Sequence, residues 1–121
     1  MPARKIVLAA GLLLLCGTAA RADVLITPPL VAEGDNVLDC YLANVGPGKK
    51  NVKIEAVTAD GEVAKFLSTT LEPGQEKVVR TTAEEAARYC KFTVSGAGKN
   101  YRGSVLVRDN GVGAISALAA F

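Results

Sequence analysis

Short runs of β-forming residues, separated by turn residues at intervals of about 8–12 positions, constrain the fold of this chain more than any other feature. Within VLDCYLAN at 37–44, Leu38, Cys40 and Leu42 alternate with polar or small residues, so they share one face of a strand. The pattern therefore predicts an all-β domain of about seven strands. The expected strands span residues 24–27, 37–44, 51–57, 63–71, 76–81, 88–95 and 101–109, and the apolar tail at 111–121 predicts a final edge strand.

One segment departs from this pattern. TTAEEAAR at 81–88 is rich in good helix formers, and Thr82 and Glu85 have the spacing of a capping box. The sequence therefore predicts one short helical turn between the fifth and sixth strands.

The N-terminus has the layout of a secretory signal peptide. Arg4 and Lys5 precede an uncharged, mostly apolar run at 6–16, and Ala20-Arg21-Ala22 forms an A-x-A site. A spanning helix needs about 20 apolar residues, so this run is too short for a stable membrane span. We expect a signal peptide helix at 1–22, cleavage between Ala22 and Asp23, and a single domain at 23–121 in the bacterial periplasm or secreted.

Cys16 offers an alternative, since bacterial lipoproteins carry a lipidated cysteine at the end of such a segment. Leu13 suits the position three residues before that cysteine, but the residue just before it should be small, and here it is Leu15. The A-x-A site downstream therefore favours removal of Cys16 with the signal peptide.

Removal of the first 22 of the 121 residues leaves 99, a size that suits one domain. The whole chain has 14 Lys and Arg against 12 Asp and Glu, but Arg4, Lys5 and Arg21 belong to the signal peptide. The mature chain thus has 11 basic and 12 acidic residues, a formal charge of −1. This balance gives no support for nucleic-acid binding, which would need a basic face.

Two cysteines remain after processing, Cys40 and Cys90, and an even pair in an exported protein predicts a disulfide rather than two buried thiols. They fall on the second and sixth expected strands, as in the inter-sheet disulfide of immunoglobulin domains. We therefore expect an immunoglobulin-like antiparallel β-sandwich. The chain has no Trp to pack on the disulfide, and Tyr89 directly precedes Cys90 instead of lying two residues ahead of it. These departures predict the sandwich architecture without membership of the antibody family.

Four motifs, CYLAN at 40–44, LEPG at 71–74, YCKFTV at 89–94 and RGSVLV at 102–107, span nearly the whole mature chain. In them the chain resembles small exported proteobacterial proteins that have a single immunoglobulin-like domain and no established activity. The resemblance implies a fold and a compartment, but no function.

The residue inventory excludes several kinds of chemistry. The chain has no His, and its single Met is Met1, so blue-copper sites and His-based zinc or haem sites are excluded. Ser-His-Asp and Cys-His catalysis are excluded for the same reason. Asp35, Asp39 and Asp60 are candidate calcium ligands, and paired carboxylates could serve a hydrolase, but isolated acids in turns are usually solvated. We expect no enzyme activity, metal or cofactor.

One surface yields a binding hypothesis. In an immunoglobulin-like sandwich, the loops GPGKKN, EPGQ and SGAGKN would lie at the same end, which would bring Lys49, Lys50 and Lys99 together. Loops rich in Asp and Glu would occupy the opposite end. The basic end could meet an anionic surface such as phospholipid headgroups, lipopolysaccharide or an acidic protein face. The simpler interpretation is that these lysines only keep solvated turns soluble.

The sequence thus predicts a non-enzymatic exported module that binds an unidentified protein or cell-envelope partner. The alternative is a structural or fimbrial-like subunit that assembles by strand exchange, for which Phe121 and the apolar tail are the only indication. A small carboxylate hydrolase ranks third.

Overall fold

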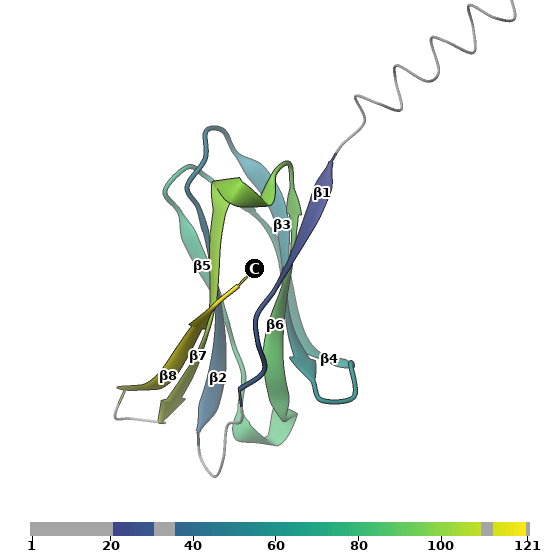
Figure 1. Ribbon diagram of the computed structural model, residues 1–121, viewed down its shortest axis with the longest axis vertical. Helices are drawn as coiled ribbons and strands as arrows, with labels where there is room; N and C mark the ends of the chain where they lie inside the picture. The colour runs from purple at the N-terminus through teal and green to yellow at the C-terminus, as the bar shows by residue number, and fades with distance from the viewer. Residues whose placement is uncertain (1–20, 31–35, 110–112, 121) are drawn as a thin grey trace, which may run out of the picture.

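A computed structural model describes residues 21–30, 36–109 and 113–120 of the chain. Residues 1–20 of the predicted signal peptide helix, Cys16 among them, lie outside these residues. The last two, Arg21 and Ala22, are described and are not helical, since Ala22 begins the first strand. The described part forms eight β-strands and two single-turn 3₁₀ helices (Figure 1). The strands are β1 (Ala22–Ile26), β2 (Val37–Asn44), β3 (Lys50–Thr58), β4 (Val63–Leu71), β5 (Glu76–Arg80), β6 (Ala87–Ser95), β7 (Tyr101–Asp109) and β8 (Gly113–Ala119).

The strands form two four-stranded antiparallel sheets packed face to face, so the predicted β-sandwich is confirmed. One sheet has the order β1-β6-β3-β4 and the other the order β5-β2-β7-β8. The predicted final edge strand is β8, which pairs with β7 along the outside of the second sheet.

The strand order departs from that of constant-type immunoglobulin domains in two respects. The fourth strand, β4, lies beside β3 and not beside the fifth strand, and the first and seventh strands are placed differently. In constant-type domains the second strand lies beside the first and the fifth, and the sixth lies beside the third and the seventh. Here β2 lies beside β5 and β7, while β6 lies beside β1 and β3. The first and last of the seven core strands have therefore exchanged sheets, and the chain crosses from one sheet to the other between β6 and β7.

The inward faces of the strands are those predicted from alternation. Leu38, Cys40 and Leu42 on β2 are buried, as are Phe92 and Val94 on β6. The Cys40–Cys90 disulfide joins the central strands of the two sheets, with 5.7 Å between the Cα atoms. The core is thus aliphatic and aromatic, with the disulfide at its centre.

Gly103 on β7 faces the ring of Phe92. A Cβ atom at Gly103 would lie 2.8 Å from Cε2 of Phe92, which is closer than real Cβ atoms approach. The absent side chain therefore makes room for the largest fully buried residue of the core.

The predicted helical turn is present as the 3₁₀ helix η1 (Ala83–Glu85). The backbone N–H of Thr82 donates to Oε1 of Glu85 at 3.0 Å, which is half of the predicted capping box. Ala86 ends the turn with a positive φ of 54° and leads directly into β6.

The first strand begins earlier than predicted, at Ala22 instead of residue 24. Its pairing with β6 runs from Ala22 opposite Ser95 to Ile26 opposite Lys91. The carbonyl oxygen of Arg21 also accepts a hydrogen bond from the N–H of Gly96 at 2.7 Å. At the other end, the hydroxyl of the buried Thr27 accepts from the N–H of Cys90 at 2.9 Å, which anchors β1 before Pro28 and Pro29 end it.

Candidate functional site

Three loops meet at one end of the sandwich, at the top of Figure 1. They connect β2 to β3, β4 to β5 and β6 to β7, and the third contains the 3₁₀ helix η2 (Gly98–Asn100). The N–H of Val45 donates to the carbonyl oxygen of Asn100 at 2.9 Å, and the N–H of Gly74 donates to that of Asn44 at 2.7 Å. The loop end, as we call these three loops, is therefore one hydrogen-bonded unit.

Asn44 holds this unit together. Its side chain is fully buried at the last position of β2. Its Nδ2 donates to the carbonyl oxygens of Gly48 at 2.9 Å and Leu71 at 3.0 Å, and its Oδ1 accepts from the N–H of Gly46 at 3.1 Å. One amide thus fixes the path of the β2–β3 loop and joins it to the end of β4.

The structure places Lys49, Lys50 and Lys99 on this end of the molecule. Lys49 and Lys99 are exposed and Lys50 is half-buried at the first position of β3. The loop end also brings in an acid, because Nζ of Lys49 lies 3.7 Å from Oε1 of Glu72 and both side chains are about 60% exposed. An exposed ion pair of this kind contributes little stability, so Lys49 stays available to other anions.

Arg102 adds a fourth cation that the sequence analysis did not single out. Its Nη1 donates to the carbonyl oxygens of Lys99 at 3.0 Å and Tyr101 at 2.8 Å. The guanidinium therefore caps the β6–β7 loop. Its position immediately after that loop was the signal that could have identified it.

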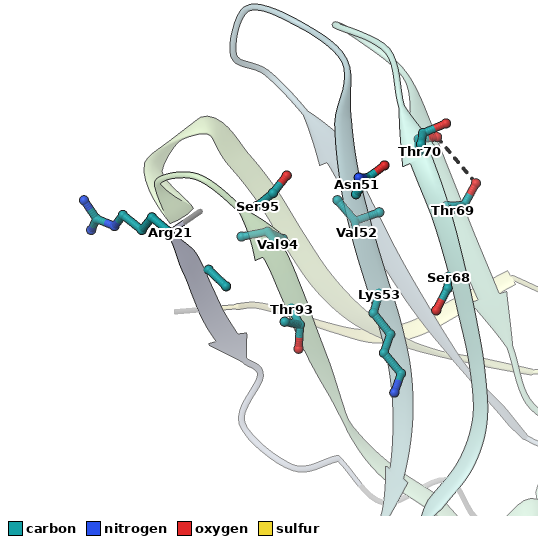
Figure 2. Close-up of a pocket in the computed structure, with 11 residues that line it drawn as sticks. Arg21, Asn51, Val52, Lys53, Ser68, Thr69, Thr70, Thr93, Val94 and Ser95 are labelled. Atoms are coloured by element: carbon teal, nitrogen blue, oxygen red, sulfur yellow. Dashed lines mark hydrogen bonds between the residues drawn. The ribbon is translucent and has the colours of Figure 1, made fainter. Parts of the chain in front are cut away.

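A shallow groove of about 710 Å³ runs down the outer face of the β1-β6-β3-β4 sheet, next to the loop end (Figure 2). All four strands contribute to its wall. Its polar side chains are hydroxyls, an amide and cations, among them Asn51, Lys53, Thr70 and Ser95. None of the described residues that line it carries a carboxylate. Its two cations are each paired with an acid outside the wall, Arg21 with Asp23 and Lys53 with Glu55, so the groove is polar and only weakly basic.

A second depression of about 490 Å³ lies at the far end of the same sheet, where β1 ends and β6 begins. It is lined by Ile26, Thr27, Pro29, Ala59, Arg88 and Tyr89. Ile26 and its neighbour on the same face of β1, Val24, are each almost half exposed. This part of the face is more apolar than the groove beside the loop end.

Asp39, one of the candidate calcium ligands, is fully buried and pairs with two arginines. It accepts hydrogen bonds at 3.2 Å from Nε of Arg80 and from Nε of Arg108. A side-chain hydrogen bond with Tyr41 and the negative charge of Asp39 raise the pKa of Arg80. Asp60 is exposed in a turn, and Asp35 lies outside the described residues. Within the described ranges, no three His, Cys, Asp or Glu residues form a group that could hold a metal ion.

The first residue after the predicted cleavage bond is tied to the loop end. Oδ2 of Asp23 accepts a hydrogen bond from the N–H of Gly98 at 2.7 Å. This bond and a second one from Arg21 hold the pKa of the Asp23 carboxyl below its ordinary value. Within the part of the chain that the structure describes, no helix is long and apolar enough to cross a membrane.

Comparison with known proteins adds little to the fold. No protein-family model matches the chain, and no curated protein matches it. Among solved structures, that of the infectious bursal disease virus Gt strain is 9% identical with a TM-score of 0.34, over 85% of this chain and 25% of that chain. The VP2 subviral particle of the same virus gives 10% identity and a TM-score of 0.34, over 85% and 26%. The chain thus spans about a quarter of these proteins, and at such values the likeness carries no argument about function.

Proposed function

We propose that this protein is a non-enzymatic, exported binding module whose loop end engages an anionic component of the cell envelope. The observation that carries the proposal is the Asn44 network, which holds the loop bearing Lys49 and Lys50 in a fixed position beside the loop bearing Lys99. Lysines on a hydrogen-bonded scaffold lose less entropy on binding than lysines on a flexible tail.

The groove beside the loop end supports the same function. Its hydroxyl and amide groups can donate to and accept from a polar headgroup, and Lys53 adds a positive charge there. Nζ of Lys53 lies 3.8 Å from Glu55 and 5.2 Å from the centre of the Phe66 ring. A headgroup bound by the lysines would therefore meet polar partners where it extends over the sheet.

Export is the second part of the proposal. The Cys40–Cys90 disulfide is typical of oxidising compartments. Cleavage between Ala22 and Asp23 would remove the first residue of β1 together with Arg21 and its hydrogen bond with Gly96. It would leave the hydrogen bond between Asp23 and Gly98 in place. The mature protein would then work in the periplasm or outside the cell.

The experiment that tests the binding function measures sedimentation with vesicles of equimolar phosphatidylglycerol and phosphatidylcholine. Each lysine near an anionic surface contributes about 1 kcal/mol, so replacing Lys49, Lys50 and Lys99 together with Gln should weaken binding about a hundredfold. A matched control replaces Lys65, Arg88 and Lys91 with Gln, which removes the same charge from the strands away from the loop end. Equal binding by the two variants would refute the role of the loop end.

A further inference from the structure

The outer face of the β5-β2-β7 sheet holds a carboxylate that alternation places toward solvent but that no solvent reaches. Asp39 is 0% exposed. Nε of Arg80 lies 3.2 Å from both of its oxygens, and Nε of Arg108 lies 3.2 Å from Oδ2. The hydroxyl of Tyr41 also donates to Oδ2 at 3.4 Å. Two guanidinium groups thus converge on one carboxylate.

The three charged residues lie on three adjacent strands. Asp39 on β2 is opposite Arg80 on β5. Val37, two residues before Asp39 on the same face of β2, is opposite Arg108 on β7. Because the strands are hydrogen-bonded to one another, the positions of the two arginines are set by the sheet. The shared carboxylate further restricts the orientation of both side chains, so little entropy remains to be lost when they bind a ligand.

Most of the donor capacity of this arginine pair, Arg80 and Arg108, is unused by the described residues. A guanidinium has five N–H donors. The Nε–H of each arginine donates to Asp39, and Arg80 also has a side-chain hydrogen bond with Tyr41, so several Nη donors have no acceptor among the described side chains. The Arg80 side chain is 54% exposed and that of Arg108 is 23% exposed. The cluster carries two positive charges and one negative charge, which leaves one positive charge at the surface.

The residues around the pair are of the kind that protein interfaces use. Val78 on β5 is 38% exposed and lies opposite the half-buried Tyr41. Leu106 on β7, also half-buried, lies opposite Asp39. Trp, Tyr and Arg are the residues most enriched at the energetic centres of interfaces. Here the arginine pair lies beside Tyr41, Val78 and Leu106, which we call the apolar strip.

We propose that the arginine pair is the anchor of a second binding surface, which docks an acidic segment of a partner protein by receiving one carboxylate on the Nη groups of Arg80 and Arg108. The partner's adjacent apolar side chains pack on Tyr41, Val78 and Leu106. This surface lies at the far end of the sheet from the loop end, because Ala43 opposite Glu76 marks the loop side of the same strand pair. The proposal of this second surface can therefore be tested independently of the envelope-binding function.

The charge of the cluster selects the ligand. One carboxylate neutralises the remaining positive charge, and its two oxygens match the planar fork of a guanidinium. A phosphate group carries about −1.5 to −2 and would leave an excess of negative charge on a face that already contains Asp39. The apolar strip favours a peptide over a sugar acid, because it offers burial to hydrophobic side chains.

The test is a nuclear magnetic resonance titration that follows the Nε–Hε signals of Arg80 and Arg108. The probe is the peptide acetyl-Ser-Leu-Glu-Leu-Glu-Ser-amide, and its matched control has Gln in place of both Glu residues. We expect saturable shifts of both arginine signals with the acidic peptide and none with the Gln peptide. Absence of saturable shifts with the acidic peptide overturns the proposal. So do equal or larger shifts with trigalacturonate or inorganic phosphate, or shifts that arise only as the protein dimerises.

Variants separate binding from folding. Arg80→Gln leaves Arg108 to pair with Asp39, so the fold should persist, while the dissociation constant of the acidic peptide rises about tenfold or more. Arg88→Gln removes the same charge from the other sheet and should leave the dissociation constant unchanged. Equal weakening in both variants would overturn the proposal, because it would reduce the effect to net charge.

Asp39→Asn distinguishes simple charge attraction from positioning of the arginines, because the two explanations predict opposite changes in peptide affinity. It raises the local charge from one positive unit to two, so simple attraction predicts tighter peptide binding. If Asp39 is a positioning residue for the two guanidinium groups, binding weakens despite the added positive charge. The titration of this variant, with circular dichroism to verify the fold, supports the proposal if affinity falls and overturns it if affinity rises.

Discussion

Asn44 and Leu71, 27 residues apart in the chain, are joined by a hydrogen bond of 3.0 Å between the side-chain amide of the first and the carbonyl oxygen of the second. This bond lies in the interior, where water cannot replace it. Asn44→Ala should therefore leave the carbonyl of Leu71 without its side-chain donor and the N–H of Gly46 without its side-chain acceptor. We expect a loss of about 3 kcal/mol in the free energy of unfolding, measured by urea denaturation. Asn51→Ala, at an exposed position, should change stability by less than about 0.5 kcal/mol.

The contact between Gly103 and Phe92 predicts a second stability effect. Gly103→Ala places a methyl group 2.8 Å from the Phe92 ring, and overpacking of this kind costs about 1–3 kcal/mol. Phe92→Leu in the same chain should recover part of that loss, because the smaller side chain vacates the space. A double-mutant cycle from thermal or urea unfolding measures the coupling, and strictly additive effects would contradict the steric explanation.

The disulfide closes a loop with a sequence separation of 50. Constraint of the unfolded chain by such a loop is worth about 4 kcal/mol in the chain-entropy model. Urea unfolding of the protein with and without a reducing agent should show a difference of that size. The variant with Ala at both Cys40 and Cys90 should be insensitive to the reductant, which separates loss of the bond from side effects of the reagent.

Asp23 gives a pH dependence with a defined sign. The N–H of Gly98 and, in the uncleaved chain, the side chain of Arg21 stabilise its ionised form, so the pKa of Asp23 is lower in the folded state than the ordinary 3.8. The contribution to stability is fully present above that value and is lost as the pH falls through the lower, folded-state pKa. Urea midpoints measured downward from about pH 5 should show this loss. Asp23→Asn should remove this part of the decline, and an unchanged decline would assign it to other carboxylates.

Mass spectrometry of the protein purified from its native compartment tests processing. We expect a chain that begins at Asp23 with a mass two units below that of the reduced form, because the disulfide removes two hydrogens. A chain beginning at a diacylglyceryl-modified Cys16 would instead assign the protein to the lipoproteins.

Local alternation was enough to predict most of the strands and their inward faces. Leu38, Cys40 and Leu42 are buried as the period of two requires, and Thr82 with Glu85 marks the helical turn. Alternation could not predict which sheet each strand joins. The exchange of β1 and β7 depends on pairing between segments far apart in the chain, and neither strand carries a residue pattern that selects its neighbour.

The candidate sites also include features that the sequence could predict and features that it could not. The placement of Lys49, Lys50 and Lys99 at one end of the molecule followed from the expected loop arrangement, since alternate connections of an immunoglobulin-like sandwich lie at the same end. The arginine pair did not, because Asp39 is 41 residues from Arg80 and 69 from Arg108, and only the register of the sheet brings them together. Asn44 was likewise missed, since an Asn at the end of a strand is common in ordinary turns.

The hydrogen bond between Arg21 and Gly96 fixes the direction in which the chain enters the domain. It places the start of β1 beside the β6–β7 loop, on the same side as the proposed envelope-binding lysines. The bond between Ala22 and Asp23 therefore lies on the same side of the domain as these lysines. Under the proposed processing, the new α-amino group of Asp23 would take the place of the lost Arg21 charge on this side of the domain.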